Sequence, residues 1–135
     1  MLARARVGLL CAAVLGASTF VGLPPEPAGA AGSTITVAPD ADATVSEAAP
    51  TKNFGGAGTL QTDSQPTFES YLRFTVTGLS GAVTSAKLRL RAVNGSGNGP
   101  AAYAAGAGWT ETGLTWATRP AWTSSALDDA GKVKA

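Results

Sequence analysis

From Ile35 onward, apolar and polar residues alternate in short runs, and clusters of Gly, Pro, Asn and Ser interrupt these runs at short intervals. A period of two is typical of β-strands that bury one side and expose the other to water. No segment beyond residue 30 carries the apolar stripe of an amphipathic helix. We expect strands at residues 34–37, 43–46, 59–62, 70–76, 86–93, 101–105 and 114–116. The sequence therefore predicts an all-β domain.

The strands expected at residues 70–76 and 86–93 show the alternation most clearly. Their buried face is expected to carry Leu72, Phe74, Val76, Ala86, Leu88, Leu90 and Ala92. Their solvent face is expected to carry Tyr71, Arg73, Thr75, Lys87, Arg89 and Arg91. Strands with one wet face are typical of antiparallel sheets, and two such sheets bury their apolar sides against each other. We therefore expect an antiparallel β-sandwich, immunoglobulin-like or jelly-roll-like.

Residues 1–30 have the features of a secretory signal peptide. Arg4 and Arg6 form a charged start, and residues 7–21 form an apolar stretch that is too short to span a bilayer. Ala28-Gly29-Ala30 supplies the small residues that precede a signal-peptidase cut. We therefore expect an exported protein whose single mature domain comprises residues 31–135 and is not held in a membrane.

The expected mature domain has neither cysteine nor histidine. The one cysteine of the chain, Cys11, lies in the signal segment, so no disulfide is available to hold the domain. The absence of histidine removes the commonest general base and the commonest zinc ligand. Loss of Arg4, Arg6 and Glu26 leaves eight basic and eight acidic residues, from ten and nine in the whole chain. This neutral balance does not favour nucleic acid or an anionic membrane as a partner.

Several segments stand out by their order and spacing. They are Ala41-Asp42-Ala43-Thr44-Val45, Lys52-Asn53-Phe54-Gly55-Gly56, Tyr71-Leu72-Arg73-Phe74, Ser85-Ala86-Lys87-Leu88-Arg89-Leu90 and Trp109-Thr110-Glu111-Thr112-Gly113-Leu114-Thr115-Trp116, with Pro120 shortly after. The tryptophan-bounded run is the most specific of them. Together they resemble the DNRLRE-type domain, which is grouped with the family 96 carbohydrate-binding modules.

The resemblance extends from Asp40 to Pro120. It implies a secreted β-sandwich of jelly-roll type that binds polysaccharide, with alginate as the substrate class. The family domain normally continues for several more strands, whereas this sequence stops at Ala135, so we expect an incomplete copy. Unpaired strand edges in such a copy would favour self-association.

The expected solvent face offers a candidate binding site. If the two clearest strands are neighbours, Arg73 lies near Lys87, Arg89 and Arg91, with Tyr71 two residues along. Arginine can grip a carboxylate through two parallel hydrogen bonds, and an aromatic ring can stack on a sugar, so such a platform suits a uronate polymer. The alternative is that these charges only keep the sheet soluble and discourage edge pairing.

The three tryptophans allow a similar pair of interpretations. Exposed rings could stack on sugars, but in a small domain without disulfides tryptophans more often supply core area. We expect Trp109 and Trp116 to have a core or corner role, and Trp122 to be the most exposed of the three and a weak ligand candidate.

The acidic residues suggest neither a metal centre nor an enzyme. Asp40, Asp42 and Asp63 are calcium candidates, but without a full loop of oxygen donors we expect them to bond nearby backbone, so no cofactor is predicted. Glu69 and Glu111 could form a glycosidase pair, but Glu111 is expected to hydrogen-bond backbone at a turn. The sequence also has no nucleophile elbow.

We therefore predict a non-catalytic module that binds acidic polysaccharide through Tyr71, Arg73, Lys87, Arg89 and Arg91. Two alternatives stay open. One is a structural or adhesive surface module without a sugar site, and the other is a small polysaccharide lyase or hydrolase.

Overall fold

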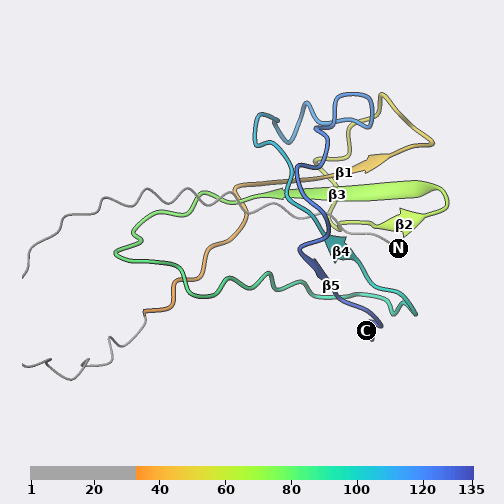
Figure 1. The fold of residues 1–135 in the computed structure, drawn as a ribbon. Coiled ribbons are helices and arrows are strands. Elements are labelled where there is room, and N and C mark those ends of the chain that lie inside the picture. The colour runs from red at the N-terminus through yellow and green to blue at the C-terminus, as the bar shows by residue number, and fades with distance from the viewer. Residues whose placement is uncertain (1–32) are drawn as a thin grey trace, which may run out of the picture.

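The computed structural model describes residues 33–135, which form an all-β fold (Figure 1). These residues contain five strands and no helix: β1 (Ala41–Ser46), β2 (Asp63–Ser64), β3 (Thr67–Arg73), β4 (Ala101–Ala102) and β5 (Asp128–Asp129). One antiparallel sheet has the order β1-β3-β2, and β4 pairs with β5 in a second. The predicted all-β, antiparallel class is confirmed, while the predicted signal peptide lies outside the described residues.

The core lies on one face of the β1–β3 pair. Opposite residues of antiparallel strands share a face, and the register places Ala43 opposite Tyr71. The small side chains of β1 leave room for large rings, and Tyr71 meets Trp109 edge to face, with ring centroids 6.1 Å apart and planes at 73°. The buried cluster comprises Ala41, Ala43, Val45, Tyr71, Trp109 and Leu114, with Ala105 and Trp116 packed against it. Residues from 105 to 116 therefore cover this face of the sheet.

A closed ring of hydrogen bonds occupies the other face. The Gln61 N–H donates to Thr44 Oγ1 at 3.1 Å, and the Ser70 hydroxyl donates to the Gln61 carbonyl at 2.8 Å. The Ser70 hydroxyl has one proton and donates it to that carbonyl. In the 2.9 Å hydrogen bond between Thr44 and Ser70, the donor is therefore the Thr44 hydroxyl. Thr44 and Ser70 are therefore buried without losing their polar partners.

Two loops that are distant in sequence meet at the edge of β1 that does not pair with β3. The Asn53 side-chain amide donates to the carbonyls of Glu111 and Leu114, at 2.7 and 2.8 Å, and its oxygen accepts from the Gly55 N–H at 3.1 Å. Glu111 Oε2 in turn accepts the Asp42 backbone N–H at 3.1 Å. We call this set of contacts the Asn53 clasp. Through Glu111 it satisfies the Asp42 N–H, which an open strand edge would leave to water or to another chain.

The structure corrects the prediction of a strand at residues 86–93. No strand is present there, and the two leucines expected to face inward are exposed, Leu88 by 37% and Leu90 by 52%. The chain between β3 and β4 instead leaves the sheet in a wide loop (Figure 1). Alternation gives a segment two different faces, but a strand also needs a neighbouring backbone, and this segment pairs with no strand among the described residues. Of the other expected strands, 43–46 and 70–76 correspond to β1 and β3, 101–105 shortens to β4, and 34–37, 59–62 and 114–116 are not strands.

Candidate functional site

Tyr71 is a core residue, and its predicted place on the solvent face is wrong. Its side chain is fully buried. Its hydroxyl lies 2.9 Å from Glu69 Oε2 and 3.1 Å from the Pro120 carbonyl oxygen, and its single proton is shared between these two acceptors. The alternation failed here because Trp109, which comes from a distant loop, covers the face that was expected to meet water. Tyr71 therefore offers no surface for a sugar ring.

Arg73 is half-buried and is used within the fold. Its Nε donates to Asp40 Oδ2 at 3.0 Å, its Nη1 donates to the Trp109 carbonyl at 2.7 Å, and its guanidinium lies 5.5 Å from the Trp109 ring centroid. Partial desolvation acts to raise the pKa of Asp40, but hydrogen bonds and the charge of Arg73 outweigh it and lower that pKa below 3.8. Arg73 therefore fastens the start of β1 to the loop that carries Trp109.

Lys87, Arg89 and Arg91 are all exposed. Because residues 86–93 are not a strand beside β3, the predicted alignment of these cations with Arg73 in one sheet is wrong. They lie instead on the wide loop between β3 and β4. The described residues provide no ion-pair partner for any of the three. We call them the cationic segment.

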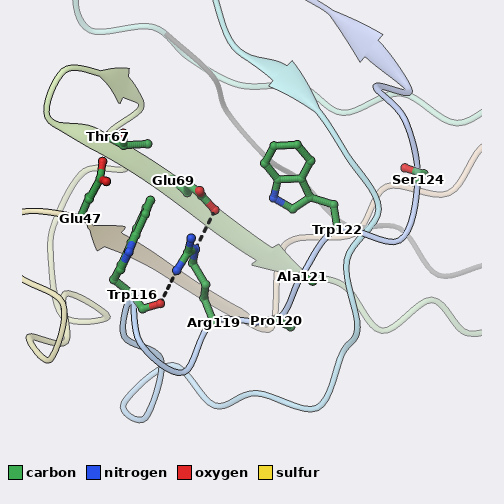
Figure 2. A pocket seen from close by; sticks show the side chains of 9 residues that line it. All are labelled: Glu47, Thr67, Glu69, Trp116, Arg119, Pro120, Ala121, Trp122 and Ser124. Carbon is green, nitrogen blue, oxygen red and sulfur yellow. Dashed lines mark hydrogen bonds and ion pairs between the residues drawn. The ribbon is translucent and has the colours of Figure 1, made fainter.

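A groove of about 650 Å³ opens beside β3 (Figure 2). Its lining residues are Glu47, Thr67, Glu69, Trp116, Arg119, Pro120, Ala121, Trp122 and Ser124. Thr67 and Glu69 come from β3, and the residues from 116 to 124 come from the loop before β5. This volume falls within the range of sites that hold small organic ligands.

Arg119 connects Glu69 on β3 with Trp116 on the loop before β5, and we call these three residues the groove floor. Its Nε lies 3.4 Å from Glu69 Oε2, its Nη1 donates to the Trp116 carbonyl, and its guanidinium lies over the Trp116 ring, 3.4 Å from the centroid (Figure 2). Glu69 is buried, and the Tyr71 hydroxyl bonds the same carboxylate oxygen. Charge and hydrogen bonds therefore fix the floor before any ligand arrives.

Trp122 is the most exposed of the three tryptophans, as predicted. It is 42% exposed, whereas Trp109 is 6% exposed and Trp116 is half-buried. Its ring is held by Tyr103, with centroids 4.6 Å apart and planes at 33°. In Figure 2 the rings of Trp116 and Trp122 lie on opposite sides of the Glu69 side chain. The groove thus combines aromatic surface with carboxylates.

Asp63 and Glu111 have structural partners. Asp63 Oδ1 accepts from the N–H groups of Ser64 and Gln65, at 2.7 and 3.3 Å, as expected for a turn aspartate. Glu111 bonds backbone, as predicted, but in strand β1 rather than at a turn. Burial first, and the negative charge of Glu111 second, raise the pKa of Asp42. Within residues 33–135 no three potential ligands gather to hold a metal ion.

Sequence reasoning missed Glu47, Arg119 and the groove they line. The available signal was Trp116 followed three residues later by Arg119 and then by Pro120, because a tight turn at this spacing can fold a guanidinium back over a ring. It also missed that the Asn53 loop and the Trp109–Trp116 run touch each other. Over the described residues no helix is both long and apolar enough to cross a membrane.

The comparisons with known proteins agree with this all-β arrangement. The model of carbohydrate-binding module family 96 matches residues 33–134, which is nearly all of the described chain. No curated protein and no solved structure shows significant similarity to it. Since the family match covers most of the sequence, the chain belongs to carbohydrate-binding module family 96.

Proposed function

We propose that this chain is a secreted, non-catalytic module that binds an acidic polysaccharide of the uronate class, such as alginate. Family membership gives the carbohydrate-binding role. The observation that carries the acidic preference is the cationic segment, where Lys87, Arg89 and Arg91 are exposed and have no carboxylate partner among the described residues.

A uronate polymer carries one carboxylate on every sugar, so it can engage several cations at once. Arginine binds a carboxylate through two parallel hydrogen bonds, which adds geometric selectivity to the attraction of charge. Each exposed pair contributes little by itself, but several pairs on one polymer act together. The three side chains are exposed on the wide loop between β3 and β4, where an extended chain can reach them.

The non-catalytic part of the proposal rests on how the candidate carboxylates are used. Glu69 is bonded by Tyr71 and paired with Arg119, and Glu111 accepts the N–H of Asp42. A glycosidase needs two carboxyl groups on opposite sides of a scissile bond, one of them ready to deliver a proton. The proposal of secretion is supported by the signal-peptide features of residues 1–30.

Affinity electrophoresis in gels that contain alginate, pectin or a neutral glucan tests the acidic preference. We expect alginate and pectin to retard the protein, and we expect Arg89→Glu to remove most of that retardation. Lys52→Glu is the matched control, because it makes the same charge change on an exposed lysine that lies over the Phe54 ring, in the connection between β1 and β2. Equal losses in both variants would contradict a specific cationic segment.

The same samples distinguish the alternatives. A folded protein that no polysaccharide retards would favour a structural surface module. New reducing or unsaturated ends after incubation with alginate would favour a lyase or hydrolase. We expect neither result.

A further inference from the structure

The groove beside β3 is chemically unlike the cationic segment. From its aromatic and acidic lining, we infer that it is a second carbohydrate site, which binds neutral hexose units rather than uronates. This inference goes beyond the proposed function, because it assigns a different ligand class to a different part of the chain.

Aromatic surface supports a sugar ligand. The faces of a pyranose ring carry C–H groups that lie well against an aromatic face, while the hydroxyl groups point outward to polar partners. Trp122 supplies a partly exposed ring at the groove, and its contact with Tyr103 keeps that ring in one orientation. A ring that is already ordered loses little conformational entropy when a sugar stacks on it.

The charges of the groove select against uronates. The lining holds two carboxylates, Glu47 and Glu69, and one guanidinium, Arg119, so one net negative charge remains. Glu69 is buried and Arg119 is partly buried beside it, so the exposed Glu47 carboxylate is the most accessible charge of the lining. It accepts hydrogen bonds from neutral sugar hydroxyls but repels a uronate carboxylate.

The loop that forms one wall is tied to the rest of the fold at both ends. The N–H of Ala117 donates to the Pro50 carbonyl at 2.9 Å. The N–H of Thr123 donates to the Ala104 carbonyl at 2.9 Å, and the Ala104 N–H donates to Ser124 Oγ at 3.0 Å. A binding site built on a fastened loop holds its side chains in place before the ligand arrives.

Titration calorimetry of the purified protein with neutral hexasaccharides of glucose and of mannose tests the inference. We expect binding to at least one of them, and we expect Trp122→Ala to weaken it by at least about tenfold. Leu127→Ala is the matched control, because it removes an exposed apolar side chain that does not line the groove and should leave the affinity unchanged. Trp122→Phe keeps an aromatic face and should recover part of the lost affinity. Circular dichroism verifies that each variant is folded.

Alginate hexasaccharide and Arg89→Glu separate this inference from the proposed function. Neutral binding that survives Arg89→Glu but not Trp122→Ala supports a distinct groove site. Alginate binding with no neutral binding overturns the groove assignment and leaves the proposed function standing. Neutral binding that Trp122→Ala does not weaken also overturns it. Absence of both kinds of binding overturns both proposals.

Discussion

The Tyr71 hydroxyl lies 2.9 Å from Glu69 Oε2, and both side chains are buried on the same face of β3. Through this hydrogen bond, Tyr71 in the core donates to the Glu69 carboxylate, which also lines the groove. It connects the stability of the fold to the shape of the groove, because Arg119 pairs with the same oxygen.

Tyr71→Phe keeps the ring but removes the donor. We expect the free energy of unfolding to fall by about 1–3 kcal/mol, because the buried Glu69 carboxylate and the Pro120 carbonyl lose a hydrogen-bond partner. Urea denaturation followed by tryptophan fluorescence measures this change. A variant as stable as the parent would mean that water replaces the hydroxyl.

Arg119→Ala removes the ion pair with Glu69 and the contact with the Trp116 ring. We expect the free energy of unfolding to fall by roughly 2 kcal/mol or more, since the buried Glu69 carboxylate loses its ion pair with Arg119. Arg119→Lys keeps the charge but not the planar group that stacks on an indole, so its loss should be smaller but measurable. Equal stability of the two variants would show that the retained charge contributes nothing, and an Arg119→Lys variant as stable as the parent would show that the ring contact contributes nothing.

Gly55→Ala should be among the most damaging small substitutions in the chain. A Cβ at Gly55 would overlap the Glu111 carbonyl oxygen and lie 2.8 Å from its carbonyl carbon, so the Asn53 clasp would have to open. Gly56→Ala is the matched control, because a Cβ there meets nothing within 4 Å. Thermal unfolding should show a large decrease in Tm for the first variant and almost none for the second.

Asp42→Asn should stabilise the protein at pH 7. Burial, and then the charge of Glu111, raise the pKa of Asp42 in the folded state above the ordinary value of 3.8. The folded chain therefore holds this proton more tightly than the unfolded chain, and stability falls as pH rises from below 3.8 through the folded-state pKa.

The gain from Asp42→Asn should thus be present at pH 7 and disappear at pH 3, because Asp42 is then protonated in both states. Tm measured across this range checks the sign. High salt should reduce the part of the gain that comes from Glu111, because salt screens partly exposed charges. A gain that persisted unchanged at pH 3 would point to a cause other than charge.

Salt should also separate the two proposed sites. Binding of alginate to the cationic segment should weaken strongly between about 50 and 500 mM NaCl, because salt screens exposed charges. Binding of a neutral hexasaccharide in the groove should change little, because stacking and hydroxyl contacts carry no net charge on the ligand. Calorimetry at the two salt concentrations measures both.

Local pattern predicted the class of the fold and the two main strands, because β1 and β3 have strong alternation and a partner beside them. The alternation of apolar and polar residues failed as a guide where a residue distant in the sequence determines whether a side chain is exposed. Trp109 buries Tyr71 from another loop, and the residues around Leu90 have alternation but no backbone neighbour among the described strands.

The candidate site was harder to predict from the sequence than the fold was. Exposure of Lys87, Arg89 and Arg91 was predicted, although their setting in a sheet was not. The groove was missed because β3 and the loop around Arg119 supply its charged groups from positions far apart in the chain, and no short motif encodes that meeting.

The Asn53 clasp also constrains the order of folding. The two hydrogen bonds that the Asn53 side-chain amide donates join residues that are 58 and 61 positions apart. The strands β1 and β3 can therefore pair while the other edge of β1 is still open. Closing so long a loop costs chain entropy before any contact repays it, which makes this step slow compared with forming a hairpin. During synthesis, the core therefore cannot be completed until the segment around Leu114 has been synthesised and has left the ribosome.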